Sequence, residues 1–220
     1  FGRAAAPIDL SRHDVNIFAE IVDAPNMNLD AILDQAKSYQ EAGADVIDLG
    51  CLPETPFAHL EEMVAMLHAA GFCVSVDSMD AQELLRGGQA GADFLLSLKE
   101  ETLWIANEVA STPVLIPSTP SDMATLYRAI DVMEGKGRAY LADPILEPIH
   151  FGFTESLVRY RDLRRRLPEA KIMMGTGNLT ELTEADSLGV QALLMGIVSE
   201  LRITNILTTQ VSAHASGVIR

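Results

Sequence analysis

Six acidic side chains of this 220-residue chain stand where short apolar segments end, a position at which an unpaired charge is costly. The clearest case is LADPILEPIHFGF, in which Asp143 closes an apolar run and Pro144 follows at once. Proline fixes its own φ angle and has no N–H, so it ends the strand and shapes the loop. The other acids in comparable positions are Asp23, Asp48, Glu54, Asp77 and Glu147.

The chemistry of such carboxylates depends on whether they converge. Asp48, Asp77 and Asp143 come from three separate apolar segments, and we interpret them as the core of one site. Carboxylate oxygens are the hard ligands that Mg²⁺ prefers. A carboxylate also accepts two parallel N–H bonds, which suits the amidine-like edge of a 2-amino-4-oxopteridine or a guanine. The residues alone leave both ligands open.

Each carboxylate also has a purely structural interpretation, because an Asp after a strand often caps the next helix. In SMDAQELL, Asp80 is placed for that task, which frees Asp77 from it. Asp48 lies inside an apolar segment, where capping does not apply and an unpaired carboxylate is expensive. Asp45 and Asp93 precede their strands, so we interpret them as structural residues at the amino ends of the strands, opposite the end that holds the other acids.

Short apolar segments alternate with helical patterns along the chain. The predicted strands are 15–22, 45–50, 72–77, 93–98, 113–117, 139–143, 171–175 and 191–196. The predicted helices are 29–41, 57–70, 81–90, 101–109, 121–133, 154–167, 179–187 and 200–213. This α/β pattern of eight strands, each followed by a helix, predicts a (β/α)8 TIM barrel, with its active site at the carboxyl ends of the strands. An open doubly wound sheet is the alternative, but no GxGxxG segment opens the chain.

The segment MMGTGNLTEL places a glycine turn after the seventh predicted strand. Asn178 in this turn is a candidate for ligand binding, and it could instead cap the helix that follows. His150 lies in the loop beyond Asp143, where a single histidine is more often a bystander than a ligand. No HExxH, CxxC, P-loop or GxSxG segment occurs, and Ser-His-Asp chemistry has no support.

The composition narrows the class of partner. The net charge of −15 repels phosphate backbones and argues against nucleic acid. No apolar run is long enough to span a bilayer, and two cysteines favour a reduced, cytoplasmic setting over a disulfide scaffold. Because the chain does not begin with Met, we expect a part of a longer protein, with 1–14 as an extension and 15–220 as one barrel domain.

The segments EAGADVIDLG, VSVDS, AGADF and ADPILEPIHFGF resemble, in order and spacing, the pterin-binding (β/α)8 family typified by dihydropteroate synthase. The nearest subgroup is the divergent one tied to methanopterin-type cofactor synthesis. The resemblance implies that Asp77 and Asp143 hold a pterin, that Asp48 is the second-strand aspartate, and that Asp23 lies near the position that binds Mg²⁺ and diphosphate. The implied reaction is attack of an arylamine on a dihydropterin methyl diphosphate, by an enzyme that is often a homodimer.

The chain departs from the family pattern in the half that holds diphosphate and arylamine. The fourth-strand Asn falls on Leu96 or Ser97, and Ser97 could replace it only in part. The seventh-strand Ser-Arg-Lys is TGN, and the eighth-strand Arg-x-His is replaced by LLMGI. Glu147 and His150 have no counterpart in the family's glycine-rich sixth loop. Two alternatives therefore stay open: a tetrahydropterin methyltransferase with a corrinoid partner, suggested by GTGN, and a non-catalytic pterin-binding module.

Overall fold

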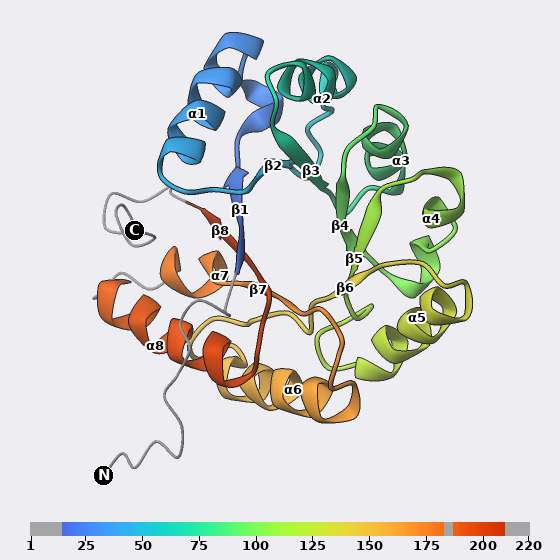
Figure 1. Cartoon of the computed structure of the whole chain (residues 1–220), viewed down its shortest axis with the longest axis vertical. Helices are drawn as coiled ribbons and strands as arrows, with labels where there is room; N and C mark the ends of the chain where they lie inside the picture. The colour runs from blue at the N-terminus through green and yellow to red at the C-terminus, as the bar shows by residue number, and fades with distance from the viewer. Residues whose placement is uncertain (1–14, 183–186, 210–220) are drawn as a thin grey trace.

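A computed structural model describes residues 15–182 and 187–209, which form one eight-stranded parallel sheet with the order β6-β5-β4-β3-β2-β1-β8-β7. A parallel bridge between Ala142 and Ile172 joins the two outer strands of this order, so the sheet closes into a barrel. Figure 1 looks along the barrel, with the strands as an inner ring and the helices outside it. The predicted (β/α)8 fold is confirmed.

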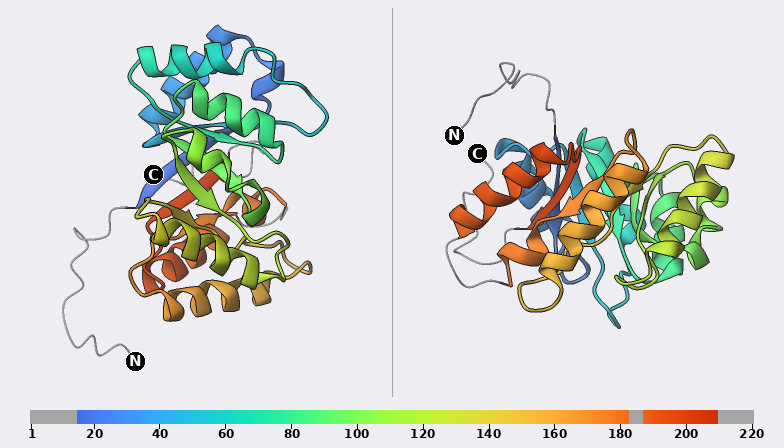
Figure 2. Two further views of the ribbon diagram at one scale, coloured as in Figure 1. Left: turned by 90° about the vertical axis from the view of Figure 1, so that its right-hand side faces the viewer. Right: turned by 90° about the horizontal axis from the view of Figure 1, so that it is seen from below.

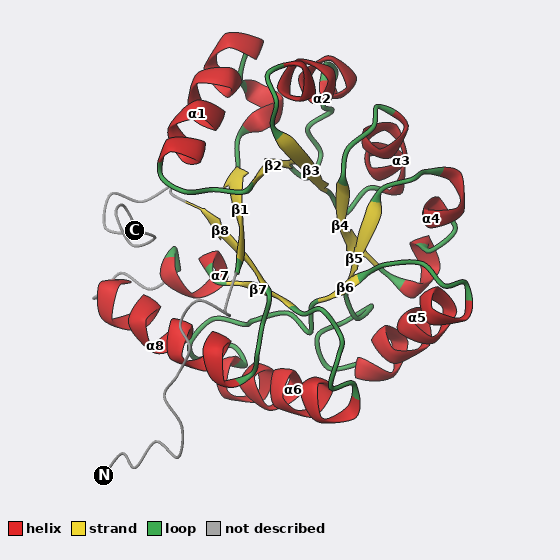
Figure 3. Cartoon of the chain, in the orientation of Figure 1, coloured by secondary structure: helices red, strands yellow, loops and turns green. Residues whose placement is uncertain are grey.

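The strands and helices alternate along the described chain (Figure 3). The strands are β1 (Asn16–Ile21), β2 (Val46–Gly50), β3 (Cys73–Asp77), β4 (Phe94–Leu98), β5 (Thr112–Leu115), β6 (Leu141–Ala142), β7 (Met173–Gly175) and β8 (Asn205–Thr209). The α-helices are α1 (Leu29–Glu41), α2 (Leu60–Ala69), α3 (Ala81–Gln89), α4 (Ile105–Glu108), α5 (Met123–Gly135), α6 (Phe153–Arg166), α7 (Gly177–Thr180) and α8 (Ser187–Glu200). Two short 3-10 helices are η2 (Ala24–Asn26) and η3 (Glu100–Thr102).

The sequence prediction was wrong for the last unit. The predicted strand 191–196 lies inside α8, and the predicted helix 200–213 contains β8. A six-residue apolar run such as QALLMG has no periodicity that separates a buried strand from a helix. The true strand, NILTT, is rich in the β-branched residues that favour strands. The family's Arg-x-His was therefore compared with the wrong segment, and NILTT itself contains neither residue.

Other predicted elements needed smaller corrections. The predicted helix 101–109 is divided into η3 and α4, and the predicted helix 179–187 overlaps the single turn α7 and the start of α8. The extension predicted at 1–14 lies outside the described residues. None of the described helices is both long and apolar enough to cross a membrane.

Two apolar clusters hold the barrel together. The larger one lies between the outer side of the strands and the helices. The side views of Figure 2 show the helices as a layer outside the strands. The smaller one fills the inside of the barrel with one residue from each of six strands, and we call it the barrel floor. The floor residues are Phe18, Val46, Leu96, Val114, Leu141 and Met173. The two clusters alternate along each strand, because successive side chains of a strand point to opposite faces.

The repeated AGAD segments have the structural role predicted for them. Asp45 Oδ2 accepts the backbone N–H of Ile17 at 2.8 Å, which ties the start of β2 to β1. Asp93 Oδ2 accepts the backbone N–H of Val74 at 2.8 Å in the same way, two units later, and lies 3.0 Å from His68 Nε2. These carboxylates therefore stabilise strand pairing at the amino ends of the strands, away from the candidate site.

Candidate functional site

The acidic residues of the site stand directly above the barrel floor. Glu20 follows the floor residue Phe18 by two positions on β1, and Asp48 follows Val46 in the same way on β2. Because side chains two apart share a face, both carboxylates point into the barrel. One oxygen each of Glu20, Asp48 and Asp77 lies within 4.8 Å of the other two. We call these three residues the acidic triad.

Asp48 is the most deeply buried member of the triad and has no exposed surface. Ser75, its neighbour in register on β3, donates its hydroxyl to Asp48 Oδ1 at 2.5 Å. Asp48 Oδ2 has no hydrogen-bond partner among the described residues. Burial, with added repulsion from the other two acids of the triad, raises the pKa of Asp48 well above its ordinary value.

An irregularity in β4 brings Ser97 to Asp77. The pairing of β4 with β5 shifts register between Leu95 and Leu98, and Ser97 has a left-handed backbone with φ 65°. Leu95 and Leu98 both pack in the outer cluster, and Leu96 belongs to the barrel floor. Because the bulge adds one residue between Leu95 and Leu98, Ser97 lies on the inner face beside Leu96. Ser97 donates its hydroxyl to Asp77 Oδ1 at 2.6 Å. Burial raises the pKa of Asp77, and this hydrogen bond opposes the rise.

Glu20 is the site residue that the sequence reasoning missed. Burial, together with repulsion from Asp77, raises the pKa of Glu20 to about 7. A Cβ atom on Gly50 would lie 2.6 Å from Glu20 Oε1, so the glycine at the end of β2 leaves the space that this side chain occupies. The signal was present in NIFAEI, where Glu20 interrupts an apolar strand as Asp48 does in VIDLG.

Asp143 stands above the floor residue Leu141, beyond the short strand β6. Its backbone N–H still pairs with Leu115 of β5, and Pro144 then ends the strand as predicted. Two groups donate to Asp143 Oδ1: the Tyr160 hydroxyl at 2.6 Å and the Ile145 N–H at 2.7 Å. Burial raises the pKa of Asp143 to about 6, and both of these hydrogen bonds oppose the rise.

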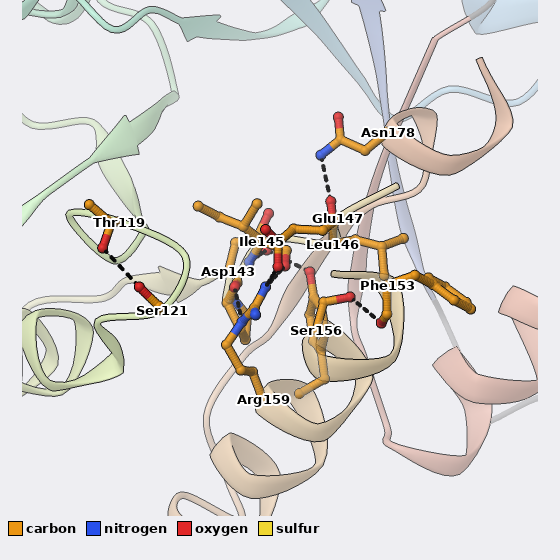
Figure 4. A network of polar contacts seen from close by, with 12 residues as sticks. Thr119, Ser121, Asp143, Ile145, Leu146, Glu147, Phe153, Ser156, Arg159 and Asn178 are labelled. Carbon is orange, nitrogen blue, oxygen red and sulfur yellow. Dashed lines mark hydrogen bonds and ion pairs between the residues drawn. The ribbon is translucent and has the colours of Figure 1, made fainter. Parts of the chain in front are cut away.

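The loop after β6 is held from below by Arg159 of α6 (Figure 4). Arg159 donates to the carbonyl oxygens of Pro144 and Ile145 at 3.1 and 2.8 Å, and it forms an ion pair with Glu147 at 2.8 Å. These bonds hold Ile145 at φ 67°, a left-handed conformation that a β-branched residue rarely adopts. Glu147, predicted to bind ligand, is therefore placed as a fixed part of this loop.

Asn178 joins the seventh loop to the sixth. Its side-chain amide donates to the carbonyl oxygen of Leu146 at 2.9 Å (Figure 4). It lies within the single turn α7, at whose start Thr176 makes no side-chain cap. Of its two sequence interpretations, capping is therefore wrong, and the side chain lies beside the loop that carries Asp143.

Three further predicted residues lie away from the triad. Asp23 is exposed at the start of η2, without a side-chain cap, and is not a member of the acidic triad. Glu54 and His150 are exposed in the loops after β2 and β6, both with positive φ angles. The structure thus brings together Asp48, Asp77 and Ser97, adds Glu20, and leaves these three residues on the rim.

The charge balance of the site is one-sided. No ion pair between a triad carboxylate and a Lys, Arg or His occurs within residues 15–182 and 187–209. Each of the aspartates Asp48, Asp77 and Asp143 has one oxygen fixed by a protein donor. Their second oxygens receive no hydrogen bond from the described residues. Such a site suits a ligand that brings N–H donors or positive charge.

Comparison with known proteins gives a consistent result for the fold. No family model matches the chain. An uncharacterized curated protein of Methanocaldococcus jannaschii is 30% identical over 94% of this chain, and the chain spans 43% of that relative's length. This relative therefore carries no activity to the chain.

Solved structures of dihydropteroate synthases superpose on nearly the whole barrel. The Yersinia pestis enzyme with a pterine-sulfa conjugate has a TM-score of 0.70 and 16% identity, and covers 98% of this chain and 95% of its own. The Vibrio fischeri enzyme has a TM-score of 0.68 and 17% identity, with coverages of 89% and 87%. The Xanthomonas albilineans enzyme in complex with 7,8-dihydropteroate has a TM-score of 0.64 and 16% identity, with coverages of 94% and 91%. The chain therefore has the (β/α)8 fold of the dihydropteroate synthases.

Proposed function

We propose that this barrel binds the pterin ring of a dihydropterin methyl diphosphate and joins it to an arylamine, in a synthesis of the folate or methanopterin type. One observation carries the proposal. Asp48 and Asp77 lie together inside the barrel, and Asp143 is close enough to Asp77 to feel its charge. Each of the three has one oxygen fixed by a protein hydroxyl and a second oxygen that receives no hydrogen bond from the described residues. The fold that the chain shares with dihydropteroate synthases supports the same assignment.

The aspartates supply recognition and charge stabilisation. A pterin presents an N–H next to an NH₂ group, and an ionised carboxylate accepts such a pair with two parallel hydrogen bonds. Asp77 and Asp143 are the candidates for this contact, because both keep partly exposed surface while Asp48 is fully buried. Holding the ring fixes its reacting methylene for the incoming amine. The same negative charges stabilise the positive charge that develops on the ring as diphosphate leaves.

Asp23 is the residue that would hold Mg²⁺ for this reaction. Mg²⁺ is commonly bound by one or two carboxylates together with substrate phosphates, and Asp23 offers an exposed carboxylate on the first loop. When bound, the ion would neutralise the negative charge of the leaving diphosphate.

The amine-binding side of the site differs from the family pattern. The seventh loop contains Thr176, Gly177 and Asn178 where the family has a lysine, and Asn178 is engaged with Leu146. We therefore propose an acceptor amine other than the ordinary one, such as an aminobenzene that carries a ribosyl phosphate. Glu54 and His150 are exposed in the second and sixth loops, and we propose them as candidates to contact such an extension.

Calorimetric titration with a dihydropterin tests the recognition step. We expect Asp143→Asn to weaken binding about 10- to 100-fold, because a hydrogen bond to a charged group contributes about 1.5–3 kcal/mol. Asp122→Asn, at the start of α5, is a control that should bind as the wild type does. An unchanged affinity in Asp143→Asn would remove Asp143 from the site.

Turnover is tested separately by diphosphate release from dihydropterin methyl diphosphate with Mg²⁺ and a panel of arylamines. Release with one amine class supports the transferase and names its acceptor. Pterin binding without release for any amine contradicts it and leaves a binding module. Methyl transfer from a methylated tetrahydropterin to a corrinoid protein would contradict it in favour of a methyltransferase.

A further inference from the structure

The acidic triad has no ion-pair partner in the part of the chain that the structure describes, although three adjacent carboxylates require a compensating positive charge. Glu20, Asp48 and Asp77 bring their oxygens within 4.8 Å of one another inside the barrel. Their polar partners among the described residues are the neutral hydroxyls of Ser75 and Ser97. Like charges at this separation repel strongly in a partly dehydrated interior, so the group needs a compensating cation or protons.

A second observation points to a ligand at the same place. Among the described residues, the buried side-chain atoms without a hydrogen-bond partner are Asp48 Oδ2 and Thr209 Oγ1. Both flank Glu20: Asp48 is its register partner on β2, and Thr209 is its register partner on β8. Thr209 shares the inner face with the floor-packed residue Leu207, two positions before it. Buried polar atoms almost always have partners, so two such atoms beside one carboxylate indicate a position where a ligand binds.

We propose that Glu20, Asp48 and Asp77 hold a hard divalent cation inside the barrel, with Asp48 binding through Oδ2. Three oxygens within 4.8 Å of one another all lie about 2.8 Å or less from a common point. Small inward movements bring them to the roughly 2.0–2.6 Å at which Mg²⁺ and Ca²⁺ bind oxygen, and water would complete the shell. The hydroxyls of Ser75 and Ser97 orient two of the carboxylates, as partners behind metal ligands do.

This cation is distinct from the Mg²⁺ proposed at Asp23, and it is compatible with the proposed pterin contact. An ionised carboxylate has about four lone-pair sites, and Ser97 uses one of those on Asp77. Asp77 can therefore bind the cation and still accept an N–H from a ligand. The cation would keep the aspartates ionised, which is the form that accepts such donors.

Binding of Mn²⁺, followed by electron paramagnetic resonance and by calorimetry with Mg²⁺ and Ca²⁺, tests the inference without any pterin. We expect the wild type to bind one equivalent more tightly than its acidic surface binds further ions. Glu20→Gln should lower the affinity for this tightly bound ion at least 10-fold, since it removes one of three anionic ligands. Glu54→Gln is the matched control on the rim of the same mouth and should retain it. Asp77→Asn gives a second variant in case Glu20→Gln does not fold.

Thermal unfolding provides the second readout. Mn²⁺ should raise the melting temperature of the wild type and of Glu54→Gln, and should not raise that of Glu20→Gln. Weak binding of several equivalents by the wild type, or an unchanged tight site in Glu20→Gln, would overturn the inference. Loss of the tight site in Asp23→Asn would also overturn it, by placing the ion on the first loop. The cation titrations contain no pterin, and the dihydropterin titration of Asp143→Asn tests the proposed function at a residue outside the triad, so the two failures can be told apart.

Discussion

Replacement of Asp143 by asparagine should stabilise the protein at neutral pH while weakening its ligand binding. Asn keeps an acceptor oxygen for the Tyr160 hydroxyl and the Ile145 N–H, and it removes the charge. Burial raises the pKa of Asp143 from 3.8 to about 6 in the folded chain. Above that pH the folded wild type holds a partly dehydrated carboxylate, and the asparagine variant does not.

The magnitude follows from linkage between protonation and folding. A raised carboxyl pKa means that the folded state binds its proton more tightly, so the contribution of this group is fully present below the unfolded pKa and is lost as pH rises through about 6. Relative to low pH, where the group is protonated in both states, a shift from 3.8 to about 6 lowers the free energy of unfolding by about 3 kcal/mol at pH 8 and by about 1 kcal/mol at pH 4.5. The partial exposure of the side chain makes these values upper bounds.

The assay is urea unfolding of wild type and Asp143→Asn at a series of pH values in the presence of EDTA. We expect the stability advantage of the variant to grow by about 2 kcal/mol between pH 4.5 and pH 8. Asp23→Asn, at an exposed position, is the control and should show a difference within about 0.5 kcal/mol throughout. A constant difference across the series, or a variant that is less stable than the wild type at pH 8, would refute the reasoning.

Three other changes test how the sixth loop is held. Tyr160→Phe removes the hydroxyl that donates to Asp143, so calorimetry should show a pterin affinity about 3- to 10-fold lower. Equal affinity would show that the tyrosine contributes packing only. Arg159→Met breaks its bonds to the loop and should lower the unfolding free energy in urea by about 2–3 kcal/mol, whereas the exposed Arg165→Met should not; similar losses in both would contradict a special role. In Gly152→Ala, alanine must adopt a φ of 120°, and its Cβ would press against the Glu147 carboxylate, so we expect the free energy of unfolding to fall by about 1–3 kcal/mol. A free energy of unfolding equal to that of the wild type would show that the loop relaxes freely.

Much of the site followed from local sequence because of a property of parallel barrels. Apolar segments that alternate with helices require parallel strands, and the carboxyl ends of parallel strands meet at one mouth. Asp48, Asp77 and Asp143 could therefore be brought together without knowing any pairing register. The structural role of Asp45 and Asp93 followed from the same reasoning, since both precede their strands.

The eighth unit could not be predicted in this way. QALLMG is an apolar run and NILTT is rich in β-branched residues, so each could form a short strand, and the local pattern does not decide which of the two lies in the sheet. The decision comes from the barrel, in which β8 fills the place between β1 and β7.

The sequence by itself determined the fold class and the position of three aspartates late in or just after their strands, because these depend on strand direction and on the alternation of side chains within a strand. The tertiary structure decided that Glu20 lies beside Asp48, that the bulge in β4 turns Ser97 toward Asp77, and that Arg159 holds Glu147 within the loop. Each of these contacts joins residues at least 12 positions apart. They depend on the register between strands and on the docking of helices, and no local pattern of residue types records either of these.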